Sequence, residues 1–134
     1  MAKMISVYLP VEDLEASMQF YLALGCSMIR RGNIDDISIM VWSETITFQL
    51  VTRSRFATLT PKTTADTKKF SEMVIMLTVD SRNEVDAVAE TAASYGGKAD
   101  NRTPTDTSGI YSRAFEDPDG HMFNVIWMDV GKAV

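Results

Sequence analysis

Cysteine and histidine are nearly absent from this chain, which has one of each among 134 residues. The single cysteine, Cys26, cannot form an internal disulfide, so we expect a cytoplasmic protein in a reducing compartment. A Cys–His catalytic pair has only His121 as its histidine, which makes a nucleophilic thiol the less favoured interpretation. No apolar run approaches the length of a membrane span, and the first residues lack the long apolar stretch of a secretory signal.

Basic residues are also in the minority, with 13 lysines and arginines against 18 aspartates and glutamates, for a net charge of −5. Because binding to a phosphate backbone needs a basic surface, this balance argues against nucleic acid as a partner. Hydrophobic residues make up 46% of the chain, which is typical of a globular fold. The length predicts one domain over residues 1–134, large enough to bury a core without disulfides.

The first half of the chain predicts one strand, one helix and three further strands. Strand 4–11 alternates between aliphatic odd positions and mixed even positions, which assigns its residues to two faces. Asp13 suits the N-cap of the following helix, and Gly25 suits its left-handed end. The three further strands are expected at 26–31, 36–42 and 45–53, with turns at Gly32-Asn33 and Ser43-Glu44.

The segment 53–71 is rich in threonine and basic residues and predicts a long connection with one short helical turn near Phe56. We interpret its basic side chains as a solvated loop in preference to a device that steers anionic ligands. The chain then divides into module one at about 1–56, a connection at about 57–70 and module two at about 71–134.

The same order of elements is expected again in the second half. Strand 72–80 alternates, and Ser81-Arg82-Asn83-Glu84 has the pattern of a capping box at the start of a helix. Gly96-Gly97 ends that helix. Three strands follow, at 97–101, 109–116 and 121–128. The sequence therefore predicts an α+β fold built by internal duplication, with two βαβββ modules.

Two motifs resemble one known family. The run LPVEDLEASMQFY at 9–21, with Leu24-Gly25 after it, resembles the first strand–helix unit of the glyoxalase/bleomycin resistance protein/extradiol dioxygenase superfamily. The run FEDPDGH at 115–121 resembles the hairpin before that family's last strand. Within the superfamily the chain looks closest to a glyoxalase-like, uncharacterised subgroup. The resemblance implies the vicinal oxygen chelate fold, with paired modules forming a concave, barrel-like mixed sheet around a small-molecule pocket.

The hairpin motif also invites a catalytic reading of Asp117 and Asp119. We prefer a structural turn, because proline presets φ, glycine permits a positive φ and aspartate caps the backbone. His121 follows the turn and is expected at the start of a strand, facing away from the pocket, in preference to a role as a proton carrier.

Active members of the family hold one divalent metal through ligands on the first and last strand of each module. The resemblance places those four positions at Ser6, Gln49, Val74 and Asn124. Valine has no donor atom, and the other three offer only neutral oxygens, whereas catalytic metals bind imidazole, thiolate or carboxylate. We therefore expect no metal cofactor, and metal-dependent isomerisation or ring cleavage is disfavoured.

Without a metal, the concave sheet is still expected to bind a small molecule. Ser6, Gln49 and Val74 lie on the less apolar faces of their strands, and methionines beside them would adapt to varied ligands. Arg113 on strand 109–116 could hold a carboxylate or phosphate, although a salt-bridged or solvated arginine is as good an interpretation. The predicted ligand-binding residues are Ser6, Tyr8, Thr47, Gln49, Val74, Met76, Tyr111, Arg113, Met122 and Asn124.

Three functions stay open. The favoured one is a protein that captures a small molecule without turnover, as in the drug-resistance branch of the family. The second is an enzyme, either metal-free or a metal-dependent lyase or dioxygenase resembling lactoylglutathione lyase or an extradiol dioxygenase. The third is a structural module with a vestigial pocket. The resemblance also implies a homodimer, for which Trp42, Phe123 and Trp127 are candidate interface residues that would serve equally well in a core.

Overall fold

The computed structural model describes residues 2–29 and 35–133 and contains two compact units, Met1–Asp66 and Thr67–Val134. The division between the units falls inside the connection expected at 57–70. In chain order the elements are β1 (Ile5–Val11), α1 (Leu14–Leu24), β2 (Ser27–Ile29), β3 (Ile37–Ser43), β4 (Ile46–Thr52), α2 (Arg53–Phe56), β5 (Val74–Thr78), α3 (Arg82–Ser94), β6 (Lys98–Ala99), β7 (Thr105–Asp106), β8 (Ile110–Glu116), β9 (Met122–Met128) and α4 (Val130–Ala133).

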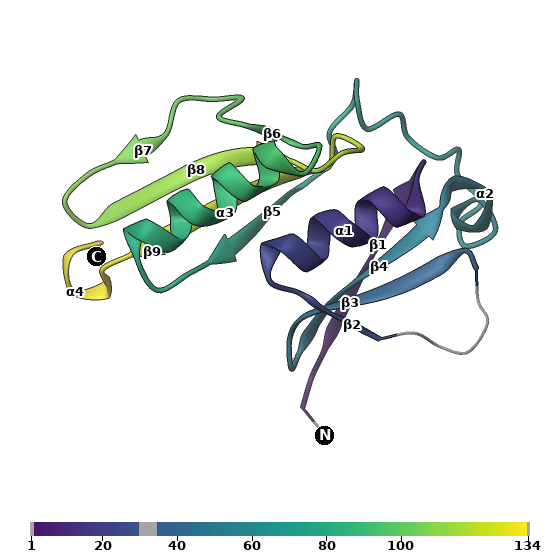
Figure 1. Cartoon of the computed structure of the whole chain (residues 1–134), viewed down its shortest axis with the longest axis horizontal. Helices are drawn as coiled ribbons and strands as arrows, with labels where there is room; N and C mark the ends of the chain where they lie inside the picture. The colour runs from purple at the N-terminus through teal and green to yellow at the C-terminus, as the bar shows by residue number, and fades with distance from the viewer. Residues whose placement is uncertain (1, 30–34, 134) are drawn as a thin grey trace. The chain divides into compact units, whose positions relative to one another are not determined.

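The first unit contains a four-stranded sheet in the order β1-β4-β3-β2 (Figure 1). β1 runs parallel to β4, and the other neighbours are antiparallel. The parallel pair requires a crossover, which α1 provides together with β2 and β3. The short helix α2 lies where a helical turn near Phe56 was expected. The expected turn at Gly32-Asn33 and the end of strand 26–31 lie outside the described residues.

Helix α1 begins and ends where its capping residues predict. The Asp13 side chain accepts a hydrogen bond from the Ala16 backbone N–H at 3.1 Å. Gly25 has a φ of 114°, a left-handed conformation that costs glycine little. The buried side of the helix packs on the sheet, where the Tyr21 ring lies 5.6 Å from the Phe48 ring. This contact fixes which face of the first sheet is the core.

The second unit repeats the arrangement of the first. Its sheet has the order β5-β9-β8-β6, with β5 parallel to β9, and α3 lies across one face of it (Figure 1). The core of this face includes Phe115 and Phe123, both fully buried and stacked with ring centroids 4.9 Å apart. The duplication of βαβββ modules expected from the sequence pattern is confirmed. The two-residue strand β7, which pairs with β8, is an addition that the sequence pattern did not indicate.

The capping box at the start of α3 is confirmed with one change of partner. The Ser81 hydroxyl accepts from the Glu84 backbone N–H at 3.1 Å. The Glu84 carboxylate accepts from the Asp80 backbone N–H at 2.9 Å, one residue before the expected partner. Both bonds satisfy amide groups near the helix start, where intrahelical acceptors are missing.

Both sheets are open, and the described strands do not close either of them into a barrel. The fold class of two βαβββ modules is therefore confirmed, while the barrel-like description applies only to the curvature of each sheet. None of the helices in the described part of the chain has the length and apolar character needed to span a bilayer.

Candidate functional site

Each sheet has one face that the helix of its own module does not cover, and we call this the open face. In the first unit the covered face holds Phe48 and Leu50, both buried, and Phe48 lies against Tyr21 of α1. In the second unit it holds Phe123 and Val125, both fully buried. Because side chains alternate along a strand, the residues between these positions point to the open face. Most of the predicted ligand-binding residues lie on the open faces.

On the first open face, hydroxyl and amide groups form neighbouring pairs on β1 and β4. Ser6 lies beside Thr47 in the parallel register, and their hydroxyl oxygens are 2.8 Å apart in a hydrogen bond. Tyr8 lies beside Gln49, and Tyr8 is 43% exposed. Ile39 of β3 is the neighbour of Gln49 on its other side. The structure therefore brings together the four residues predicted in this unit.

On the second open face, apolar side chains predominate. Val74 lies beside Met122 and Met76 lies beside Asn124 in the register of β5 and β9. Val74 is 53% exposed and Met76 is 56% exposed, and both belong to β5, an edge strand of this sheet. Asn124 is half-buried and supplies an amide among these apolar groups. The structure brings these four predicted residues together as well.

Tyr111 and Arg113, the other two predicted ligand-binding residues, do not share this face. Both lie on the face that α3 covers, opposite Trp127 and Val125 of β9. The Tyr111 hydroxyl donates to the Asp86 carboxylate of α3 at 2.6 Å. The Arg113 guanidinium forms ion pairs with Asp86 at 2.9 Å and with Asp100 at 2.8 Å. The alternative interpretation of Arg113 as a salt-bridged residue therefore matches its surroundings.

The contacts in this network shift the pKa values of its members. The hydrogen bond from Tyr111 lowers the pKa of Asp86, and the charge and hydrogen bond of Arg113 lower it further against the opposing effect of burial. The same hydrogen bond raises the pKa of Tyr111, because ionisation would place two negative charges side by side. The carboxylates around Arg113, Asp100 first, raise its pKa. The network is thus charged and structural at neutral pH.

The even-numbered residues of β8 occupy the open face in place of Tyr111 and Arg113. Ala114 lies beside Asn124, and Glu116 lies beside Met122. Sequence reasoning did not single out these residues, although a signal was present. In the hairpin that the 117–120 turn closes, each step forward along β9 is matched by one step backward along β8. Even-numbered residues of β9 therefore pair with even-numbered residues of β8, as Asn124 does with Ala114.

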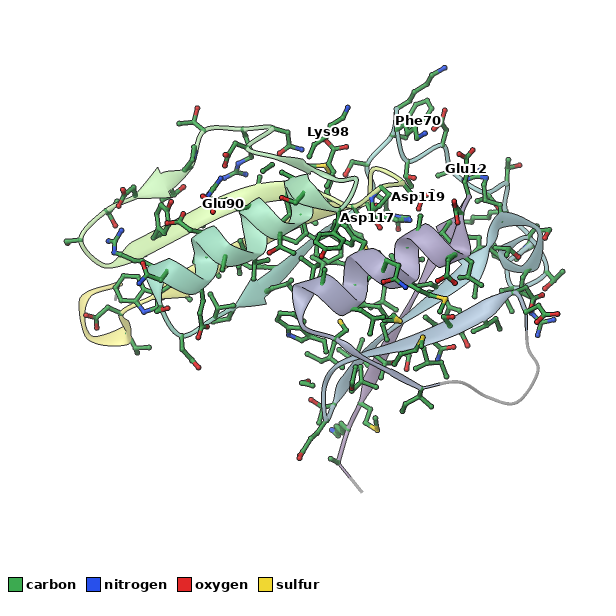
Figure 2. All side chains as sticks on the ribbon, viewed as in Figure 1. Glu12, Phe70, Glu90, Lys98, Asp117 and Asp119 are labelled. Atoms are coloured by element: carbon green, nitrogen blue, oxygen red, sulfur yellow. The ribbon has the colours of Figure 1, made fainter. Side chains whose placement is uncertain are left out.

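Asp117 and Asp119 form the turn that the sequence predicts, at the junction of β8 and β9 (Figure 2). The Asp117 carboxylate accepts from the backbone N–H groups of Asp119 at 3.0 Å and His121 at 2.8 Å. Gly120 has a φ of 88°. His121 is 9% exposed and lies in this hairpin directly before β9. The burial of Asp117 and Asp119 is therefore explained by their part in forming the turn.

The Cys26 thiol is buried, and burial raises its pKa to about 12. A thiol with so high a pKa is almost wholly protonated at neutral pH, and the thiolate is the nucleophilic form. Cys26 therefore lacks the properties of a catalytic nucleophile.

The donor atoms at the four positions that correspond to metal ligands suit a catalytic metal poorly. Ser6 already shares its hydroxyl with Thr47, Val74 has no donor, and Gln49 and Asn124 have neutral amides. Zinc, iron and nickel in catalytic sites bind imidazole, thiolate or carboxylate groups, so this set does not fit such an ion. The described residues also contain no group of three or more His, Cys, Asp or Glu side chains arranged to hold a metal.

Comparison with known proteins places the chain in a family. The model of the Glyoxalase/Bleomycin resistance protein/Dioxygenase superfamily matches residues 3–125. Hypothetical protein SA1046 from S. aureus is similar in structure with a TM-score of 0.79 and 30% sequence identity, over 95% of both chains. A search of the curated proteins gave no significant match.

Two further solved structures share the fold at lower identity. A glyoxalase/bleomycin resistance protein/dioxygenase family enzyme from Burkholderia phytofirmans PsJN has a TM-score of 0.77 and 16% identity, over 95% of this chain and 99% of that chain. TnmS3, an antibiotic binding protein from Streptomyces sp. CB03234, has a TM-score of 0.66 and 17% identity, over 96% of this chain and 98% of that chain. The extent of the family match and the repeated βαβββ order agree, and the chain belongs to the glyoxalase/bleomycin resistance protein/dioxygenase superfamily.

Proposed function

We propose that this protein binds a small organic molecule on an open face of its sheets and does so without a catalytic metal. The observation that carries the proposal is the exposure of Val74 and Met76 beside a half-buried Asn124. Neighbouring apolar side chains that stay exposed can mark a binding surface, and small-molecule sites combine such apolar walls with a few polar groups. The first open face, taken by itself, carries the hydroxyl and amide groups of Ser6, Tyr8, Thr47 and Gln49.

The flexible side chains of the second open face support binding in preference to a rigid structural role. Met76 and Met122 have unbranched side chains that adjust to ligands of different shape. TnmS3, which has the same fold, is described as an antibiotic binding protein. The proposed binding set omits Tyr111 and Arg113, because both are held by Asp86 on the other side of the sheet.

The alternative of a metal-dependent lyase or dioxygenase has weaker support. Such chemistry needs a metal that polarises a substrate oxygen or activates water. The residues at the four ligand positions, with a valine among them, offer too few and too weak donors for that task.

We also propose that the protein forms a homodimer. Phe123 is excluded as an interface residue because it is fully buried and stacked on Phe115. Trp42 and Trp127 are partly exposed and stay candidates. Aromatic residues of this kind are enriched in protein interfaces.

Metal content and ligand binding can be tested separately on the purified protein. We expect elemental analysis to find no stoichiometric Zn, Ni, Fe or Mn, and we expect neither these ions nor EDTA to shift the melting temperature. Ligand binding is measured in a fragment screen by the ε-methyl NMR signals of the methionines, where Met76 and Met122 should respond and the buried Met40 should not. A bound metal at one ion per chain, or a fragment screen that leaves Met76 and Met122 unmoved, would contradict the proposal.

A further inference from the structure

Glu116 is the one carboxylate that β8 places on the second open face. It lies beside Met122 of β9, which in turn lies beside Val74 of β5, so the three side chains form a row across the sheet. Lys98 of β6 is its neighbour on the other side and appears in Figure 2. No described residue, Lys98 included, forms an ion pair with Glu116. A half-buried carboxylate thus stands at the edge of an apolar surface without a cationic partner in the described part of the chain.

Asn101 fixes the direction of this carboxylate. Its Nδ2 donates to Oε2 of Glu116 at 3.0 Å and lies 3.4 Å from Sδ of Met122. Among the described residues, no donor bonds to the second oxygen, Oε1. An ionised carboxylate only accepts hydrogen bonds, so its remaining capacity is for a donor from outside the chain.

Asn101 is in turn held through the residue before it. Asp100 has a φ of 59°, and its backbone N–H donates to the Ala114 carbonyl at 2.8 Å. Its carboxylate accepts two hydrogen bonds from Arg113, at 3.0 and 2.8 Å. Arg113 lies on the covered face, whereas the partner of Asn101 lies on the open face. Asp100 therefore anchors the chain to one side of the sheet while Asn101 reaches the other.

We propose that Glu116 and Asn101 form a subsite for a protonated amine on the small molecule, an inference that rests on the proposed function. The second carboxylate oxygen is accessible to a donor, and a cationic N–H donor forms a shorter and stronger bond with it than a neutral one. The neighbouring Val74, Met76 and Met122 provide an apolar surface for the rest of the ligand. The ligand class is thus an amine carried on an apolar body, with Asn101 as a positioning residue.

A matched pair of probes tests the subsite. 4-Phenylbutylamine and 4-phenylbutan-1-ol share one apolar body and differ in the charged group. Each is titrated against the full chain while the ε-methyl signals of Met76 and Met122 are followed by NMR. We expect the amine to bind about tenfold more tightly than the alcohol, as one charge-assisted hydrogen bond would provide.

Three variants separate the subsite from the apolar surface. Glu116→Gln should abolish the preference for the amine and leave the affinity for the alcohol unchanged. Asn101→Ala retains the charge of Glu116 but removes the hydrogen bond that orients its carboxylate. This variant should reduce the preference for the amine over the alcohol to about threefold. Glu44→Gln, which removes the same charge from an exposed turn of the first unit, should retain the full preference. Thermal unfolding of each variant checks that the fold persists.

The possible failures point to different conclusions. Equal binding of both probes by the unaltered chain would overturn the amine subsite and leave small-molecule binding intact. A preference for the amine that survives Glu116→Gln, or that is lost equally in Glu44→Gln, would also overturn it, because the selectivity would then come from the general negative charge. If neither probe moves Met76 or Met122, both the subsite and the proposed function fail.

Discussion

At the scale of single residues, the second unit contains a partly exposed charge network whose state changes with pH. Asp86 accepts a hydrogen bond from Tyr111 and an ion pair from Arg113, and its pKa is lower in the folded chain than the usual 3.8. A carboxyl group with a lowered folded pKa stabilises the fold above its unfolded pKa, and this stabilisation is lost as the pH falls through the folded pKa. The relevant window is therefore below about pH 4.

We predict that Asp86→Asn weakens this acid dependence. The variant should be less stable than the unaltered protein at pH 7, and its stability should fall less steeply between pH 4 and pH 2.5. Urea unfolding at a series of pH values measures both slopes. Exposed Glu44→Gln serves as the control, and equal slopes for all three proteins would show that Asp86 does not carry the effect.

Gly120 gives a second prediction at this scale. Its φ is 88°, and a Cβ atom there would lie 2.5 Å from the Thr67 carbonyl oxygen. Gly120→Ala therefore combines backbone strain with a collision and should destabilise the fold by at least about 2 kcal/mol. Gly25 has a φ of 114°, and a Cβ atom added there would have no other atom within 4 Å. Gly25→Ala should therefore lower the free energy of unfolding by about 1 kcal/mol through backbone strain alone. Urea unfolding measures the stability of both variants. An equal loss of stability in Gly120→Ala and Gly25→Ala would contradict the steric clash at position 120.

At the scale of helices and strands, the start of α3 depends on its side-chain caps. The Ser81 hydroxyl accepts a hydrogen bond from the Glu84 backbone N–H, and no other side chain in the described first turn accepts from that N–H. Ser81→Ala should lower the free energy of unfolding by about 1 kcal/mol. The exposed Asn83→Ala in the same turn is the matched control and should change it by under about 0.5 kcal/mol. Chemical denaturation monitored by circular dichroism makes the comparison.

Elements with a clear period or a capping residue could be predicted from the sequence, and the others could not. Asp13 and Ser81 marked the helix starts because N-capping needs those side chains at that position. Strand β7 was missed because two residues, Thr105 and Asp106, contain no measurable alternation.

The candidate site was predicted in part for a similar reason. Alternation divides β8 into two faces, but each face carries apolar residues, Phe115 on one and Ala114 on the other. Alternation alone therefore does not decide which face the helix covers, and it did not separate Tyr111 and Arg113 from the residues of the open face. The register of the hairpin with β9 decides it, and this depends on the length of the turn.

At the scale of the whole molecule, the homodimer proposal has a direct measurement. One chain has a mass of 14.9 kDa, and we expect light scattering after gel filtration to give about twice that value at micromolar concentration. Replacement of the partly exposed Trp42 or Trp127 by alanine should shift the equilibrium towards the monomer for whichever residue lies in the interface. A monomer mass that persists up to millimolar concentration would contradict the proposal.

The parallel pairing of β1 with β4, and of β5 with β9, also bears on how the chain is synthesised. Each sheet joins the first strand of its module to the last, so neither can be completed until its own final strand has left the ribosome. The N-terminal sheet needs nothing beyond Thr52 for its backbone pairing and can assemble while the rest is still being translated. A premature stop within β9 would consequently leave the earlier sheet paired and deprive β5 and β8 of their shared neighbour.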